Sequence, residues 1–216
     1  MRPGFAGWLA CGFALVATRI GAEPVLSAEE RAILPRVLQA VHVDISQEHI
    51  GAERAVLLAS RNPDAAKADL VILAGEPDDN AGQPLAIGRD LVWMGLMAGQ
   101  VPRLDVTESG GLRLHAEQIG IGRSPWEETL TLAEREGQIR IAGYTLKQWD
   151  RLTAASATCD WNLLTGNWVQ DVTMPAESDL PPIHHEGNRP AHYLLSDWNG
   201  EDHGWPDFCM VDLTAF

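Results

Sequence analysis

Positive charge is scarce in this sequence. Its 216 residues include 16 Lys and Arg against 30 Asp and Glu, which gives a formal net charge of −14 at pH 7. No stretch is rich in basic residues, and an acidic surface repels the phosphates of nucleic acids and of anionic membranes. The composition therefore argues against nucleic acid as a partner and disfavours anionic membrane surfaces for the chain as a whole.

Long hydrophobic runs are also missing. The apolar run at residues 5–17 is shorter than the roughly 20 apolar residues that a membrane-spanning helix needs. Arg2 precedes this run and the small residues Gly21 and Ala22 follow it, which is the layout of a secretory signal peptide over residues 1–22. We expect a periplasmic or secreted mature protein with no stable membrane insertion after signal removal. A retained membrane anchor is the alternative.

Cysteine is nearly absent, with three residues in the chain. Cys11 lies inside the predicted signal, so cleavage leaves Cys159 and Cys209 in a compartment where disulfides persist. We predict that these two form a disulfide, which closes a loop of about 50 residues and stabilises the fold by roughly 4 kcal/mol. Two buried thiols are the alternative. Signal removal also takes away two arginines and no acid, so the net charge falls from −14 to −16.

The sequence that follows the predicted signal peptide predicts an α+β fold. Ser27 and Glu30 have the spacing of a capping box, and helical spacing of apolar residues follows at Ile33, Leu34, Val37, Leu38 and Val41. Pro35 is expected to kink or restart this helix. From about residue 53, short apolar or alternating runs separated by Gly, Pro, Asn and Asp are typical of antiparallel strands. We expect a single domain over residues 23–216, with an N-terminal amphipathic helix packed on a mostly antiparallel sheet of serial hairpins.

Individual strands follow from period-2 alternation and from turn residues. A strand is weakly favoured over a buried helix within residues 85–101, and residues 174–190, with four prolines, are expected to be an irregular loop. Other strands are expected at residues 54–59 and 69–74, and two hairpins are expected between residues 103 and 146. A further hairpin should join residues 158–164 to 167–173, and two closing strands are expected at 191–195 and 208–213.

Three short segments resemble a family of secreted bacterial proteins that has no established activity. The family shares the pattern Gly-x-Gly-Arg-x-x-Trp-x-x-Thr-Leu-Thr, then Gly-Tyr-Thr, then Asn-Leu-Leu-Thr-Gly. This chain carries these patterns within residues 119–132, 141–145 and 159–166. The resemblance implies a β-hairpin domain in the periplasm or outside the cell.

The C-terminal region is similar to the calcium loops of extracellular β-propeller repeats. Asp197, Asn199 and Glu201 keep the alternating oxygen ligands that a hard cation prefers. Asp202 stands where those loops have a turn glycine, which favours a solvated acidic turn instead. No other cofactor is expected.

Histidines and acidic residues are the remaining candidates for metal binding or catalysis. His184, His185, His192 and His203 lie close in the sequence to Glu186, but their spacing matches no standard zinc pattern. We interpret them as surface residues of a polar loop.

Glu128 is predicted to lie on the same strand face as Trp126 and Leu130. If that face is buried, its carboxyl group needs either a raised pKa or a partner such as Arg123 or Arg140. A structural ion pair is the favoured interpretation.

No serine lies in a Gly-x-Ser-x-Gly motif, so catalytic residues remain unknown. The tryptophans near predicted turns are expected to fill the core, although exposed rings would stack on sugars; they are Trp161, Trp168, Trp198 and Trp205. We therefore expect a non-enzymatic protein that binds or scaffolds an envelope protein or glycan. The alternatives are an envelope hydrolase that uses His115 or the C-terminal histidines and acids, and a calcium-stabilised extracellular module.

Overall fold

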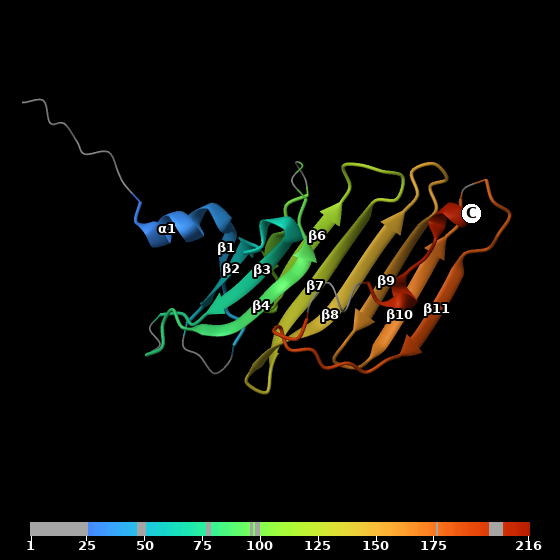
Figure 1. Cartoon of the computed structure of the whole chain (residues 1–216). Helices are drawn as coiled ribbons and strands as arrows, with labels where there is room; N and C mark the ends of the chain where they lie inside the picture. Colours follow the sequence, from blue (N-terminus) through green and yellow to red (C-terminus); the bar gives the residue numbers. More distant parts are fainter. Residues whose placement is uncertain are drawn as a thin grey trace, which may run out of the picture.

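Two antiparallel β-sheets form the body of the protein in the computed structural model (Figure 1). The predicted signal, residues 1–22, lies outside the part of the chain that the structure describes. The described residues are 26–46, 51–76, 79–95, 97, 100–175, 177–198 and 205–216.

The smaller sheet has four strands in sequence order, β1 to β4, and the larger has seven in the order β11-β10-β9-β8-β7-β6-β5. The smaller sheet contains β1 (Val37–Val43), β2 (Glu53–Ala59), β3 (Lys67–Leu73) and β4 (Pro84–Trp93). The larger contains β5 (Arg103–Val106), β6 (Leu112–Gln118), β7 (Trp126–Arg135), β8 (Gln138–Trp149), β9 (Ser156–Asn162), β10 (Asn167–Thr173) and β11 (Ile183–Asn188). Short helices are α1 (Ala28–Ile33), η1 (Leu34–Arg36), η2 (Pro63–Ala65), η3 (Asp207–Cys209) and η4 (Leu213–Ala215).

The predicted α+β class is wrong, because the N-terminal amphipathic helix is not there. The capping box of Ser27 and Glu30 forms, but α1 ends at Ile33 and buries none of its residues. Pro35 lacks the backbone N–H that would continue the helix, and the β-branched residues after it favour a strand. The rest of the expected apolar stripe lies in β1, where Val41 pairs with Ala55 of β2.

The C-terminal third also differs from the expected pattern. The loop expected at residues 174–190 contains β11, which pairs with β10. The closing strands expected at 191–195 and 208–213 are replaced by a single bridge, Arg140 to Leu194, and by η3 and η4. Residues 193–195 still attach to β8, because Ile141 N–H donates to Tyr193 O and Leu195 N–H donates to Ile139 O.

The inner face of the large sheet is covered by two different parts of the chain. The small sheet packs over one end, where β4 contacts β6 and β8. The C-terminal segment, red in Figure 1, lies across β9 and β10. The predicted disulfide between Cys159 of β9 and Cys209 of η3 is present and fixes this segment, with Cα atoms 5.3 Å apart. The Gln170 side chain adds a hydrogen bond to Phe208 O at 2.9 Å.

The two sheets are joined at their edges by one side chain. The Gln39 amide on β1 donates to Leu104 O on β5 at 3.0 Å and accepts from Leu104 N–H at 2.7 Å. This reciprocal pair satisfies both backbone groups of a residue that is 2% exposed. Gln39 therefore acts like a short piece of strand that holds β1 beside β5.

Replacing Gln39 with alanine should destabilise the protein by about 1–3 kcal/mol, because a buried N–H and a buried C=O lose their partners. Urea unfolding of Gln39→Ala measures the change. Gln83→Ala, at an exposed residue between β3 and β4, is the control. Equal costs for the two variants would contradict a joining role for Gln39.

Candidate functional site

The outer face of the large sheet carries aligned polar side chains. Cross-strand pairing places Arg113, Thr131 and Gly143 side by side on β6, β7 and β8. The adjacent row contains His115, Thr129, Thr145 and Asp160, on four consecutive strands. Alternation along each strand produces these rows, because the residues between them face the core.

A groove of about 440 Å³ lies in this face, and we call it the outer groove. Gly143 contributes no side chain to its floor, and the strand register shifts between Thr131 and Leu132, as at a β-bulge. A Cβ atom on Gly143 would lie in ordinary contact with Thr131 Cβ, at 3.5 Å, so a methyl group would fit there without a clash. Its polar lining includes Arg113, Thr131, Arg135, Thr145, Asp160 and Asn162.

The charge of the outer groove differs from that of the whole chain. Arg113 is exposed, and Arg135 donates from Nη1 to the carbonyl of the neighbouring Glu134. Asp160 accepts a 2.6 Å hydrogen bond from the Thr145 hydroxyl, which fixes both side chains. Two guanidinium groups and several hydroxyls suit a ligand that has carboxylate or phosphate groups together with hydroxyls.

Beside the groove, an acid, an imidazole and a hydroxyl lie in line across β5, β6 and β7. An Asp105 carboxylate oxygen is 2.9 Å from His115 Nε2, and His115 Nδ1 is 2.8 Å from Thr129 Oγ1. Burial, together with the positive charges of Arg103 and Arg113, lowers the pKa of His115 although Asp105 raises it. The imidazole is therefore neutral at pH 7 and able to accept a proton.

Glu128 lies on the opposite, inner face of β7. Its side chain is enclosed between the sheets, with the Tyr144 hydroxyl 3.5 Å from Oε2. Burial raises its pKa to about 7, while Lys67 and hydrogen bonds from Tyr144 and Trp205 oppose the shift. The raised pKa predicted for a buried Glu128 is confirmed.

The arginine partners suggested for Glu128 pair with other acids. Arg123 donates to Asp150 at 2.5 Å, and Arg140 donates to Glu136 at 2.9 Å. Neither arginine therefore pairs with Glu128, because both guanidinium groups already have acidic partners in nearby turns.

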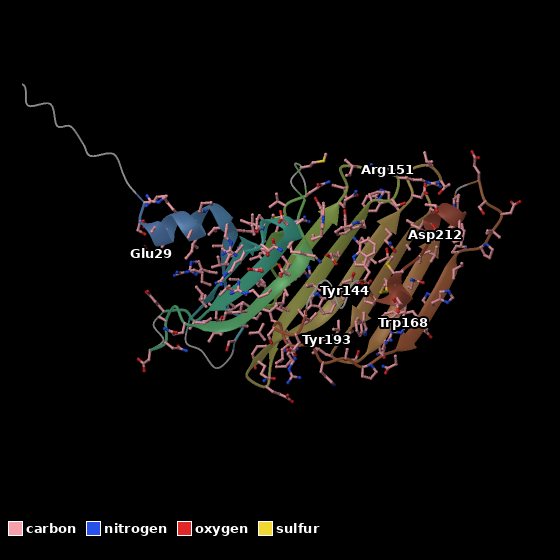
Figure 2. All side chains as sticks on the ribbon, in the orientation of Figure 1. Glu29, Tyr144, Arg151, Trp168, Tyr193 and Asp212 are labelled. Carbon is pink, nitrogen blue, oxygen red and sulfur yellow. A yellow bond between two sulfur atoms is a disulfide. The ribbon has the colours of Figure 1, made fainter. Side chains whose placement is uncertain are left out.

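Tryptophan rings pack around this interior acid. Trp126 meets Trp93 and Trp205 edge to face, with ring centroids 5.7 Å and 5.1 Å apart. Trp161 and Trp198 are buried in the same core, and Trp168 packs against it. Figure 2 shows Tyr144, Trp168 and Tyr193 over the large sheet. These rings fill the core, as the sequence favoured.

Of the C-terminal candidates in the described part of the chain, His184 and Glu186 come together on β11, where His184 Nε2 lies 3.8 Å from a Glu186 carboxylate oxygen. His184 on β11 contacts Asp171 of β10 at 2.7 Å, and His185 lies opposite Gln170. Asp197 accepts from the Leu194 N–H and the Ser196 hydroxyl. Asn199, Glu201, Asp202 and His203 lie outside the described residues. Among described residues, no group of three His, Cys, Asp or Glu side chains is placed to hold a metal ion.

Comparison with known proteins identifies no relative of this chain. No family model, no curated protein and no solved structure matches the chain. Within the described residues, no helix has the length and apolar content needed to cross a membrane. Function has to be inferred from the geometry alone.

The outer groove is the feature that sequence reasoning missed. Its residues lie far apart in the sequence and belong to no motif. The alternation of Thr129 and Thr131 with Leu130 and Leu132 indicates only that the threonines lie on the solvent face of a strand. The sequence signal for the groove is Gly143 inside a strand pattern. A glycine within a strand often marks a β-bulge or a place where a ligand or another backbone approaches closely.

Glu128→Gln should stabilise the protein in a pH-dependent way. Because the pKa of Glu128 is about 7 in the folded protein against a usual 4.5, its contribution to stability is present below pH 4.5 and is lost as the pH rises through 7. Glutamine stays neutral, so the variant should gain up to about 3 kcal/mol over wild type above pH 7 and little at acidic pH. Urea unfolding at several pH values measures this difference. Glu127→Gln, on the outer face of the same strand, is the control, and the same pH-dependent gain there would contradict the assignment.

Proposed function

We propose that this chain is a secreted or periplasmic, non-enzymatic protein that binds an acidic glycan of the cell envelope in its outer groove. The observation that carries the proposal is the groove itself. It lies over Gly143, which has no side chain, and is lined by Arg113, Arg135, Asp160 and threonine hydroxyls, in a chain whose net charge is −14. Guanidinium groups bind carboxylates, and the hydroxyls suit the alcohols of a sugar.

The location rests on two supports. Residues 1–22 have the pattern of a signal peptide, and Cys159 is bonded to Cys209. Structural disulfides persist in oxidising compartments and are rare in the cytosol. An envelope ligand is accordingly the one that this protein would meet.

The size of the groove favours a small ligand over a protein surface. Its volume of about 440 Å³ is within the range of sites for small molecules, which is roughly 300–1,000 Å³. A stable protein interface would instead bury about 800 Å² on each partner. One or two sugar residues fit this space.

Arg113→Ala should weaken binding of an oligogalacturonate by about tenfold or more, because it removes a charge-assisted hydrogen bond worth roughly 1.5–3 kcal/mol. Gly143→Val should abolish binding by filling the floor of the groove. Calorimetric titration measures both effects, with a neutral oligosaccharide of equal length as the ligand control. Arg54→Ala, at an exposed arginine on β2, is the protein control. Equal losses in Arg54→Ala and Arg113→Ala would argue against the groove.

An envelope hydrolase is the second candidate, and the line of Asp105, His115 and Thr129 favours it. The order of acid, imidazole and hydroxyl is that of a nucleophilic triad. A hydrolase also needs donors for the oxyanion, but Thr129 lies within a strand paired on both sides, so the backbone N–H groups around it face neighbouring strands. Binding without hydrolysis is therefore our first proposal.

Incubation of wild-type protein with acidic oligosaccharides and simple esters distinguishes the two candidates. We expect no turnover by mass spectrometry, because oxyanion donors are missing around Thr129. Turnover that disappears in both His115→Gln and Thr129→Val, with binding retained, would establish the hydrolase instead.

Calcium binding by Asp197, Asn199 and Glu201 stays a prediction from the sequence. Neither candidate function requires an ion at these residues.

A further inference from the structure

The two ends of the outer groove differ in charge. Arg113 on β6 and Arg135 on β7 line one end, and Asp160 and Asn162 on β9 line the other. In the order of the large sheet, three steps between neighbouring strands separate β6 from β9 (Figure 1). At about 4.8 Å a step, the backbones at Arg113 and Asp160 are roughly 14 Å apart. A ligand that fills the groove therefore meets cations at one end and an acid at the other.

Acidic residues also lie near the cationic end, but outside the lining of the groove. Asp105, Glu108 and Glu134 are the acids closest to this end along the chain and across the strands, and none of the three lines the groove. Asp105 contacts His115 Nε2 at 2.9 Å, and Glu134 accepts a hydrogen bond from the Gly137 N–H. The two arginines are therefore the charged groups that a ligand contacts at this end.

The neighbours of Asp160 hold its side chain at the opposite end. The Thr145 hydroxyl donates to Asp160 Oδ1 at 2.6 Å, while the residue itself is exposed. On the next strand Asp160 pairs with Val169 of β10, which brings no charge. Lys147, the next outer-face residue along β8, lies opposite Glu127 of β7. Asp160 thus presents a fixed carboxylate to the groove, and a carboxylate accepts hydrogen bonds but donates none.

A carboxylate at this place discriminates between acidic and neutral sugars. It accepts from the hydroxyl or amide N–H groups of a neutral sugar, but it repels the carboxylate of an acidic one. Asn162, which lies opposite Gly143 in the neighbouring row, adds an amide that both donates and accepts. The β9 end of the groove therefore suits a sugar with hydroxyls or an N-acetyl group and without a carboxylate.

We propose that the outer groove selects a glycan in which an acidic sugar alternates with a neutral one, and that Asp160 makes this selection. The carboxylate of the acidic sugar binds at Arg113 and Arg135, and its neutral neighbour lies over Asp160. A glycan with a carboxylate on every sugar places one of them against Asp160, where like charges repel. Specificity then comes from a group that rejects the wrong ligand as well as from groups that bind the right one. This selection rests on the glycan binding proposed above and narrows its ligand to one class.

Calorimetric titration of the full chain, without its predicted signal, with two tetrasaccharides tests the selection. One alternates glucuronate with N-acetylglucosamine, and the other is tetragalacturonate. Wild type should bind the alternating ligand about fivefold more tightly, the factor for two like charges about 4 Å apart in water. Asp160→Asn keeps an acceptor for Thr145 and should remove this preference by strengthening the binding of tetragalacturonate. Asp64→Asn, at an exposed residue of η2 in the small sheet, makes the same change in net charge and should keep the preference of wild type.

The results separate failure of the selection from failure of glycan binding. Wild type that binds neither tetrasaccharide would overturn glycan binding and the selection with it. Wild type that binds both equally, or tetragalacturonate more tightly, would overturn the selection and leave glycan binding in place. The same holds if Asp160→Asn keeps the wild-type preference. An equal loss of preference in Asp64→Asn would assign the effect to the net charge of the chain and would also overturn the role of Asp160.

Discussion

The contact between Gln39 and Leu104 determines how the two sheets meet. A side-chain amide has one donor and one acceptor in nearly the geometry of a peptide group, so it can replace a missing strand partner. With β1 held beside β5, the small sheet folds over the inner face of the large one. That closure encloses Glu128 and leaves the opposite face of β7 in water.

Two titratable residues on neighbouring strands show how burial acts on the two faces of the large sheet. Glu128 and His115 lie on β7 and β6, on opposite faces of the same sheet. Burial disfavours charge in both, so the pKa of Glu128 rises while the pKa of His115 falls. Near pH 7 the interior acid is about half protonated and the imidazole is neutral. Neither side chain thus carries a full charge near pH 7, although the chain as a whole is strongly acidic.

The strands that sequence reasoning found are those with clear period-2 alternation, such as the one containing Leu130 and Leu132. The N-terminal helix was mispredicted because Val37 and Val41 satisfy helical spacing as well as strand pairing, and only a partner such as β2 decides between them. The disulfide was predictable because the predicted signal peptide contains Cys11, which leaves Cys159 and Cys209 as a pair. The outer groove was not, because the register shift beside Thr131 depends on tertiary pairing. The rise in the pKa of Glu128 followed from its neighbours on one strand, but its partners come from other strands.

The covalent link between β9 and η3 also sets an order of events in time. Every strand pair within the two sheets joins neighbours in the chain, so each hairpin can form before the C-terminal segment is in place. Cys209 lies 50 residues after Cys159 and follows every strand of the two sheets. Oxidation therefore completes the molecule and cannot guide its start. A chain in which Cys209 is not yet bonded to Cys159 would hold formed hairpins with the inner faces of β9 and β10 uncovered, the state most exposed to proteolysis.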